Sequence, residues 1–574
     1  MKLLLRVNAE TASNEKVYAV GSIEKLGNWD ISNALCLTRN AVDKNEWNAE
    51  LDVASNDVIE YSYFVAAPLC DEKTFVVRRW ESGKRYTFNS SVANADNIHK
   101  LRSGNVGVVS NAFGINCNAV EIIIDGTQLN WWNNELKSKQ LSYKLTAFNS
   151  EANGDCISKM EFAILNDTQC SFQSQDKLQV FNQNEIIVFR CFVCNTNDMV
   201  VRVTFFEDES ENSVASCAFV VKESQSHIKV PLLDEMSGTI GTVNLSYLVV
   251  KPFSGFKFEL HKDCSLFKSR MINGIHVGHK GAGNNRRHDT VENVIENTIA
   301  SLNYAADHGA DMVEFDVVLT KDNIPVLYHD FHVDVSLTTK VSKEGELFSL
   351  KVKDLTFNQL HTLKLRPVVL NGITKFEISE TDNPDNQPFV SLEKVLKVVK
   401  PIAFNLEIKY PTFEDNHLNM NEYVDAILNT LAQYGGDRDV VISCFDPNVC
   451  TMLRLKQNKY LVLYLTHGNP SRYLGLKTVD RRMWTVEIAS YYAQCMNFVG
   501  VNCNVRCLME NMSLVDFVSS RNLLLFCFGD DINHSEVISK LQKAGVHGII
   551  YDRLARPLFK ISTLTFNFLF TSQN

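Results

Sequence analysis

The sequence predicts a multidomain protein in which two β-sandwiches are followed by a TIM (β/α)8 barrel. The chain has 574 residues, too many for one ordinary domain. Short apolar runs separated by turn residues fill roughly the first 265 positions, without a long helical period between them. From about residue 270 strand-like runs alternate with helical patterns eight times, which is the order and size of a TIM barrel.

Composition and charge narrow the class of function. The chain is 45% hydrophobic and 22% charged, as soluble globular proteins are. A net charge of -10 argues against nucleic-acid binding, which depends on Lys and Arg neutralising phosphates. A small anionic substrate stays open, because a bound cation can reverse the field of a site.

The cysteines and the N-terminus indicate a cytoplasmic protein without a membrane span. The fifteen cysteines have no structural-zinc spacing, and the Cys191–Cys194 pair has no second pair to complete such a site. We therefore expect free thiols in a reducing compartment. The start, MKLLLRVNAE, lacks the apolar core of a signal peptide, and no uncharged run reaches the ~20 residues of a membrane helix.

Residues 1–100 alternate apolar and polar positions in short runs, which predicts a small antiparallel β-sandwich. The pieces VGSIEKLGNWD, IEYSYF and RRWESGKRY resemble a starch-binding (family 20) carbohydrate-binding module. The resemblance implies that Trp29 and Trp80 stack on glucose units of glycogen or a starch-like glucan, although Ser62 stands where the family usually has a long basic residue. Trp47 is expected in the core, and a purely structural role for all three tryptophans is the alternative.

Residues 105–265 contain further β-type runs, among them AVEIIIDG, NEIIVFRCFV and GTVNLSYLVVKP. A second β-sandwich is the expected architecture. This segment has no catalytic constellation, so its role stays unassigned beyond interaction or spacing.

Residues 270–560 carry the predicted barrel, with a polar insertion at about 335–390 between its second and third strands. The expected strands are HVGHKGAG, MVEFDVV, IAFNLEIKY, DVVISCF, YLVLYL, NFVGVN, LLLFCFG and VHGIIYD. The first helix is expected within IENTIASLNYAADHG, where Ile295, Ile299, Leu302 and Ala306 recur at helical spacing.

Acidic and basic side chains gather where these strands end, the edge at which TIM barrels carry out chemistry. Because the strand period is two, Glu314 and Asp316 point to the same face, and Glu407 and Lys409 repeat this spacing on the third strand. Like charges on an apolar strand repel each other unless a positive charge lies between them. His279 and Lys280 follow the first strand, and His329 follows a short excursion after the second.

This set of residues suits metal-assisted phosphodiester cleavage. Three carboxylates, Glu314, Asp316 and Glu407, favour a hard divalent ion, Mg²⁺ in the first place and Ca²⁺ as the alternative. The lysines would meet a phosphate, and the two histidines would act as general base and general acid near neutral pH.

The motifs GHKGAGN, ENTIASLNYAADHGADMVEFDVVLTKDNIPVLYHD, FNLEIK and VHGIIYDR resemble the glycerophosphodiester phosphodiesterase family. With the N-terminal module, the chain is most similar to its cytosolic glycerophosphocholine phosphodiesterase subgroup. The resemblance implies cleavage of glycerophosphocholine to choline and sn-glycerol 3-phosphate, in glycerophospholipid catabolism. It also implies an acid/base pair in His279 and His329, a metal site at Glu314, Asp316 and Glu407, and phosphate contacts from Lys280 and Lys409.

Two residues depart from the family pattern. Lys280 replaces the arginine of the usual HRG motif. Lysine keeps the positive charge but cannot form the bidentate hydrogen bonds that a guanidinium makes to phosphate. Phe528 stands where the family commonly has tryptophan, a change expected to affect head-group fit.

Two other functions compete with this interpretation. The same barrel could act on another glycerophosphodiester or on a lysophospholipid, but no amphipathic basic helix is evident that would meet an acyl chain or membrane. A non-catalytic glucan-binding regulator is the alternative from another class. A decayed enzyme would be expected to have lost one of its catalytic groups, and none is missing.

Overall fold

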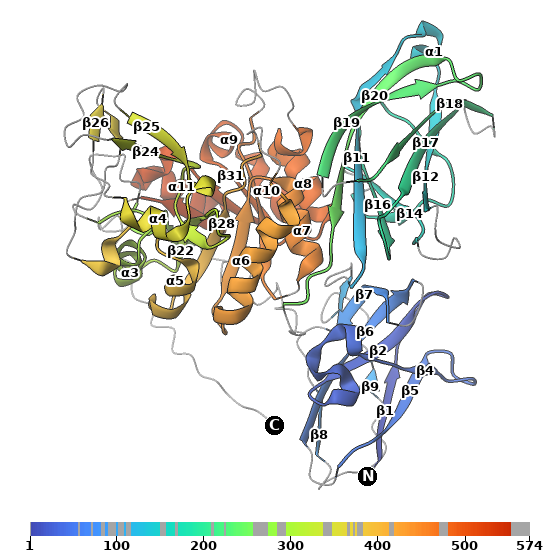
Figure 1. Cartoon of the computed structure of the whole chain (residues 1–574), viewed down its shortest axis with the longest axis horizontal. Coiled ribbons are helices and arrows are strands. Elements are labelled where there is room, and N and C mark those ends of the chain that lie inside the picture. The colour runs from blue at the N-terminus through green and yellow to red at the C-terminus, as the bar shows by residue number, and fades with distance from the viewer. Residues whose placement is uncertain are drawn as a thin grey trace.

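The computed structural model has three parts: a β-sandwich at the N-terminus, a second one in the middle and a barrel at the C-terminus (Figure 1). The structure describes residues 2–54, 58–69, 73–81, 86–89, 99–100, 108–110, 116–149, 157–166, 170–207, 212–222, 225–255, 274–283, 294–336, 347–363, 368–370, 373–375, 383–412, 418–457, 459–469 and 480–552. No helix in these ranges is long and apolar enough to cross a membrane.

Two mainly antiparallel sheets form the N-terminal sandwich, with β9 parallel to β1, and they share one core around Leu5, Trp47 and Tyr63. One sheet has the order β4-β5-β1-β9, and the other runs β10-β7-β6-β2-β3, with β8 paired to β6. The strands are β1 (Lys2–Asn8), β2 (Lys16–Gly21), β3 (Leu35–Cys36), β4 (Thr38–Arg39), β5 (Glu46–Asp52), β6 (Val58–Pro68), β7 (Phe75–Glu81), β8 (Tyr86–Asn89), β9 (His99–Lys100) and β10 (Val108–Ser110). Two short 3-10 helices, η1 (Glu24–Trp29) and η2 (Ile31–Asn33), follow β2.

The middle part is a ten-stranded sheet that folds over itself around a single core, as predicted for a sandwich. Its order is β14-β13-β16-β11-β20-β19-β18-β17-β12-β15. The elements are β11 (Asn118–Trp131), α1 (Asn134–Ser138), β12 (Leu141–Asn149), β13 (Glu161–Ile164), β14 (Gln173–Ser174), β15 (Gln179–Val180), β16 (Ile186–Val193), β17 (Met199–Glu207), β18 (Ser213–Val220), β19 (Gln225–Leu233) and β20 (Thr239–Val250).

The C-terminal part is a closed barrel of eight parallel strands, which confirms the predicted TIM architecture. The order is β21-β33-β32-β31-β30-β29-β28-β22, and pairing of β21 with β22 closes the ring. Its strands are β21 (Ile275–Gly278), β22 (Met312–Leu319), β28 (Ala403–Ile408), β29 (Val440–Cys444), β30 (Leu461–Thr466), β31 (Gly500–Asn504), β32 (Leu524–Phe528) and β33 (Gly548–Tyr551). All eight lie within or overlap the predicted runs. Parallel strands that are covered on both faces consist mostly of apolar residues, which makes them visible in the sequence.

Helices cover the outside of the barrel (Figure 1). They are α3 (Ile299–Asp307), α5 (Leu392–Val398), α6 (Met420–Tyr434), α7 (Pro447–Lys456), α8 (Val486–Cys495), α9 (Val505–Glu510), α10 (Ser513–Ser520) and α11 (Ser535–Ala544), with the 3-10 turns η6 (Pro384–Asn386), η8 (Arg481–Met483) and η9 (Asp530–Asn533). Between β22 and α5, the described part of the insertion and of the segment that precedes it contains β23 (Pro325–Leu327), β24 (His332–Ser336), β25 (Leu347–Lys351), η5 (Val352–Asp354), α4 (Phe357–Thr362), β26 (Val368–Leu370) and β27 (Ile373–Lys375).

The first barrel helix begins later than its apolar spacing predicts. Ile295 lies outside α3, because Asn297 has a φ of 57° and Thr298 caps the helix together with Ser301 in a capping box. The helix therefore starts at Ile299, directly behind the turn that follows β21.

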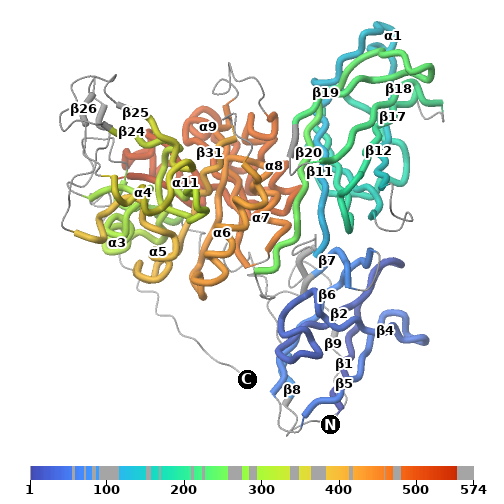
Figure 2. The backbone as a smooth tube through the Cα atoms, in the orientation of Figure 1, coloured from blue at the N-terminus to red at the C-terminus, as the bar shows by residue number. Residues whose placement is uncertain are grey.

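The middle sandwich packs on the barrel through outward-facing residues of β11, β16 and β20. Figure 2 shows β11 and β20 beside α7 and α8. Alternate residues of β11 serve two cores: Ile122 faces the sandwich interior, whereas Ile123 joins the core that the sandwich shares with the barrel. Hydrogen bonds reinforce this packing, since Asn421 of α6 accepts from the Lys251 N–H and donates to the Val249 carbonyl, both at 2.9 Å.

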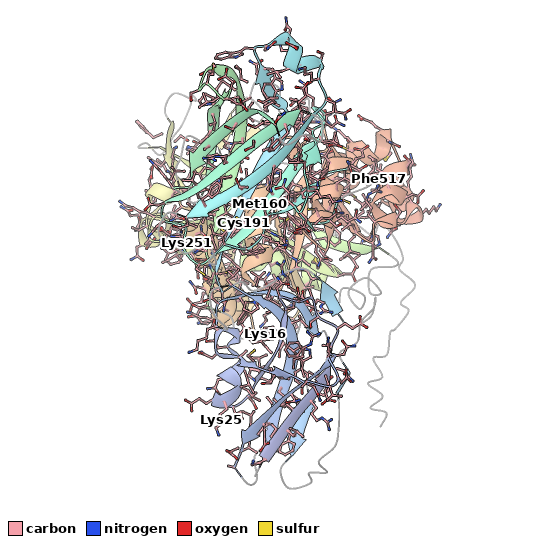
Figure 3. All side chains as sticks on the ribbon, turned by 90° about the vertical axis from the view of Figure 1, so that its right-hand side faces the viewer. Lys16, Lys25, Met160, Cys191, Lys251 and Phe517 are labelled. Atoms are coloured by element: carbon pink, nitrogen blue, oxygen red, sulfur yellow. The ribbon has the colours of Figure 1, made fainter. Side chains whose placement is uncertain are left out.

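The N-terminal and middle sandwiches form a column at one side of the barrel. Figure 3 shows the N-terminal module, labelled at Lys16 and Lys25, below the middle sheet that carries Met160 and Cys191. An ion pair of 2.6 Å between Arg78 and Glu161 connects the two sandwiches.

The cysteines of the described chain are mostly buried free thiols, eleven free in all. Cys191 is one of them, as expected. Cys194 departs from that expectation because it is disulfide-bonded. It lies just beyond the end of β16 and is only half-buried, so its sulfur leaves the sheet core that holds Cys191.

Candidate active site

Three carboxylates meet at the carboxyl end of two neighbouring barrel strands. Glu314 and Asp316 project from β22, Glu407 projects from β28, and Asp316 is the register partner of Glu407. One oxygen from each lies within 4.8 Å of the others, and all three residues are buried.

The local chemistry of this acidic triad fits a divalent cation. One Glu314 oxygen, Oε1, is buried and has no hydrogen-bond partner within the described structure. Burial, followed by the neighbouring Asp316 and Glu407, raises the pKa of Glu314 to about 8. A buried oxygen without a partner and mutually repelling carboxylates are what a hard ion with oxygen ligands relieves.

Backbone and amide groups hold the triad in place. The Lys280 N–H donates to Glu314 Oε2 at 2.9 Å. The Asn297 side chain donates to Asp316 Oδ2 at 2.9 Å and accepts from the Asp316 N–H at 3.0 Å. Both hydrogen-bond partners come from the segment between β21 and α3, so the first turn of the barrel orients Glu314 and Asp316 on the second strand.

The two predicted histidines border the same cavity, and each ring is oriented by an aspartate at Nδ1. His279 Nδ1 lies 2.6 Å from Asp552 Oδ1, and His329 Nδ1 lies 2.6 Å from Asp330 Oδ1. Asn533 in turn donates to Asp552 Oδ2 at 3.0 Å and accepts from the Asp552 N–H at 2.9 Å.

The electrostatic surroundings of His279 favour its protonated form. Burial acts to lower the pKa of this imidazole, but the charge and hydrogen bond of Asp552, together with Glu314, raise it to about 9. His279 Nε2 faces the triad at 4.0 Å from Glu314 Oε2. The raised pKa favours a proton on both ring nitrogens, and Nε2 is the nitrogen that faces the carboxylates.

The two predicted lysines have different surroundings. Lys409 lines the cavity, with Nζ 2.8 Å from Glu407 and 3.7 Å from Asp316. Lys280 is 2% exposed, does not line the cavity, and its Nζ lies 3.0 Å from Glu296. The reason is its backbone φ of 49°, in the turn that directs the side chain behind the triad. Burial opposes the charge of Lys280, but Glu296 and Asp316 raise its pKa, so it contributes a positive charge through space.

Beyond the triad, round the rim from β29 to β32, the cavity has an aromatic wall, defined here as Phe445, His467 and Phe528. Phe445 stacks on His467 with ring centroids 4.7 Å apart and meets Phe528 edge-on at 5.7 Å. The whole cavity has a volume of about 530 Å³. One side is thus acidic and carries the histidines, whereas the other is largely apolar.

The structure brings together six of the seven catalytic, metal and phosphate residues expected in the barrel, and only Lys280 lies away from the cavity lining. Sequence reasoning did not assign roles to Asp552, Asn533, Asn297 or Glu296. All four lie in or beside motifs that carry the family resemblance, namely ENTIAS, FGDDIN and GIIYDR. Membership of these motifs was the only feature of the sequence that could have indicated a role for them.

The residues expected to bind glucan lie in the N-terminal sandwich. Trp29 ends η1, is half-buried, and packs partly against a cluster that includes Tyr18 and Phe64. Trp80 lies in β7, and its side chain is outside the described residues. Ser62 is fully buried, and Trp47 is a core residue with 4% exposure, as expected for Trp47.

The sequence matches three known families. The Glycerophosphoryl diester phosphodiesterase family matches residues 279–556, the Starch binding domain matches 1–97, and the GDE1-like C2 domain matches 129–254. The last match gives the middle sandwich, whose role the sequence left open, a family of its own.

Two curated relatives match nearly the whole chain. The glycerophosphocholine phosphodiesterase of Rattus norvegicus is 30% identical over 94% of this chain and 88% of its own length. The Homo sapiens protein of the same name is also 30% identical, with the same coverage of 94% and 88%. Among solved structures, an Oleispira antarctica phosphodiesterase in complex with sn-glycerol-3-phosphate is 16% identical, with a TM-score of 0.37, over 51% of this chain and 96% of that one.

Proposed function

Because the chain belongs to the glycerophosphodiester phosphodiesterase family, we propose that it hydrolyses glycerophosphocholine to choline and sn-glycerol 3-phosphate. The observation that carries this proposal is the single cavity in which the acidic triad faces two aspartate-held histidines. Metal-assisted phosphodiester chemistry needs these groups within reach of one phosphate.

Glu314, Asp316 and Glu407 would hold the cation, with Mg²⁺ favoured over Ca²⁺ because three carboxylates with room for water and phosphate suit a small hard ion. The ion when bound supplies positive charge that offsets the charge of the phosphate oxygens. Lys409 pairs with Glu407 and would be available to the phosphate once the triad is neutralised. The Lys280 ammonium lies outside the cavity lining and offsets part of the negative charge of Asp316 and Glu314. We assign it no direct phosphate contact.

The histidines would divide the proton transfers between them. Asp552 raises the pKa of His279, which suits this imidazole to protonate the choline oxygen as it leaves. His329 directs Nδ1 at Asp330, which leaves Nε2 to accept a proton from the attacking hydroxyl. In this assignment the glycerol hydroxyl beside the phosphate attacks first, as the family resemblance implies, and expels choline to leave a cyclic glycerol phosphate. Water then opens the ring, with the two histidines exchanging roles, and gives sn-glycerol 3-phosphate.

The aromatic wall supports a choline head group. A quaternary ammonium is attracted to the faces of aromatic rings, and the Lys409 ammonium already lies 5.9 Å from the centroid of Phe445. The trimethylammonium group would therefore sit on the apolar side of the cavity while the phosphate meets the triad.

Choline release from glycerophosphocholine tests the proposal. We expect the purified protein to release choline with Mg²⁺, to lose activity in EDTA and to regain it when Mg²⁺ is restored. His279→Ala should lower kcat by roughly 100-fold or more. Equal release by the variant and the unaltered protein would overturn the acid role, and faster turnover of lysophosphatidylcholine would overturn the substrate.

We also propose that the N-terminal module binds glycogen or a starch-like glucan and that the protein works in the cytoplasm. The Starch binding domain match and the half-buried Trp29 support the first proposal. The eleven free thiols of the described residues support the second, although Cys194 is disulfide-bonded. Co-sedimentation with glycogen should weaken in Trp29→Ala. Trp132→Ala, which removes a tryptophan that is 57% exposed on the middle sandwich, is the matched control and should bind as before.

A further inference from the structure

Asn502 is a buried polar residue for which the described barrel provides no hydrogen-bond partner. It projects from β31 into the cavity and is 1% exposed. Within the described structure neither its amide oxygen nor its amide nitrogen has a partner. Its register partners on the two adjacent strands are Leu465 and Phe526, neither of which has a polar side chain.

A buried amide without partners destabilises a protein, so an unpaired one that faces a cavity indicates a ligand. Asn502 stands four strands from β22 in either direction round the barrel, and therefore opposite the acidic triad. A substrate whose phosphate meets the triad would extend across the cavity toward this amide.

The chemistry of an amide identifies which part of the substrate it meets. A carboxamide donates through its nitrogen and accepts through its oxygen. The trimethylammonium group can do neither, and phosphate oxygens only accept. A hydroxyl group does both. We propose that Asn502 binds the terminal glycerol hydroxyl of the substrate and is the residue that selects glycerol diesters.

This inference rests on the proposed function and adds a specificity determinant to it. The aromatic wall holds the head group at the rim of the barrel, and the triad holds the phosphate. Asn502 pairs in register with Phe526, two residues before Phe528, so it lies deeper in the barrel than the wall and recognises the alcohol that stays on the phosphate. A site built to hydrogen-bond a hydroxyl rejects an analogue that lacks it, because its own polar atoms would then stay unpaired.

The test compares two substrates in two variants. The first substrate is glycerophosphocholine, and the second is the phosphocholine diester of propane-1,2-diol, which keeps the hydroxyl beside the phosphate ester and lacks the terminal one. The unaltered enzyme should prefer glycerophosphocholine in kcat/KM. Asn502→Leu should lower kcat/KM for glycerophosphocholine by roughly 100-fold and make the two substrates nearly equal.

Thermal unfolding separates recognition from a structural role. Leucine is close to asparagine in shape and removes a buried amide without partners, so Asn502→Leu should unfold at the same temperature or a higher one. If leucine prevents folding, Asn502→Ala, which removes the amide without adding bulk, should show the same loss of preference. Unchanged preference for glycerophosphocholine in a folded variant overturns the inference, whereas failure of the unaltered enzyme to release choline overturns the proposed function instead.

Discussion

At the residue scale, the proton chemistry depends on groups that do not contact substrate. Asp552 holds the His279 ring in one orientation, and Asn533 holds Asp552 through two hydrogen bonds. This chain of contacts raises the pKa of His279 and aims Nε2 into the cavity. Asp552 is therefore a positioning residue whose charge sets the proton affinity of the proposed acid.

Asp552→Asn should lower activity and shift its pH dependence. Removing the carboxylate removes the main partner that raises the pKa of His279, so the imidazole loses its proton at lower pH. Because a general acid works only while protonated, the alkaline limb of kcat/KM should move to lower pH. We also expect a fall of about 100-fold or more near pH 7.

A pH profile of choline release measures this shift. Asp330→Asn is the comparison, since it alters the partner of the other histidine. An alkaline limb that stays in place in Asp552→Asn would show that His279 is not the acid.

At the element scale, the turn between β21 and α3 controls the site. Gly281 has a φ of 80°, and a side-chain carbon added there would lie 2.5 Å from the Ser301 carbonyl carbon. The close approach lets Lys280 donate its N–H to Glu314 while Ser301 donates its hydroxyl to the Lys280 carbonyl. The glycine of the HKG motif therefore allows the end of β21, the start of α3 and Glu314, a predicted metal ligand, to come into contact.

Gly281→Ala should destabilise the barrel and disrupt the site. The left-handed backbone costs an alanine about 1 kcal/mol, and the backbone clash adds to it, so we expect a loss of roughly 2–3 kcal/mol or more in total. Gly309→Ala is a matched control, because Gly309 has a similar φ of 86° and nothing within 4 Å of the added carbon. Thermal unfolding and choline release should both suffer in Gly281→Ala, with only a small drop in unfolding temperature for Gly309→Ala; equal effects would contradict the role of the clash.

At the scale of the whole molecule, the middle sandwich and the barrel share a core that contains buried charge. Glu121 of β11 is fully buried, and in the described structure its carboxylate interacts with the Thr451 hydroxyl of α7 and with two arginines. Burial raises the pKa of Glu121, and the attraction of Arg190 and of Arg482 from the barrel offsets this only in part. The charged form is therefore a source of instability at the contact between the two parts.

Glu121→Gln should raise the unfolding temperature at pH 8. A carboxyl group with a raised pKa binds its proton more tightly in the folded state, so its contribution to stability falls as pH rises from the unfolded value of 4.5 through the folded value. The gain from glutamine should be on the order of 1 kcal/mol at pH 8 and shrink as pH falls toward 5.

Calorimetric scans from pH 8 to pH 5 measure this dependence. Glu161→Gln is the opposite control, because Glu161 forms ion pairs with Arg78 and Arg190 and its neutralisation should lower the unfolding temperature. A lower unfolding temperature for Glu121→Gln at pH 8 would contradict the prediction.

Local sequence patterns were enough to predict the architecture and much of the site. Strands have a period of two and parallel barrels carry their chemistry at one end, so the pattern alone placed Glu314, Asp316, Glu407 and Lys409 on one face. The helix start at Ile299 was less accessible, because capping by Thr298 overrides the apolar spacing that begins at Ile295.

Other features depend on contacts between distant parts of the chain, which no local pattern encodes. His279 and Asp552 are 273 positions apart, and the direction of Lys280 follows from a turn that packs on Ser301. Asn502 has no hydrogen-bond partner among the described residues because its neighbours in the ring are apolar. The docking of the middle sandwich on the barrel likewise depends on both faces of β11: one packs in the sandwich core and the other in the core shared with the barrel. Periodicity specifies which face a side chain occupies, whereas packing decides what that face meets.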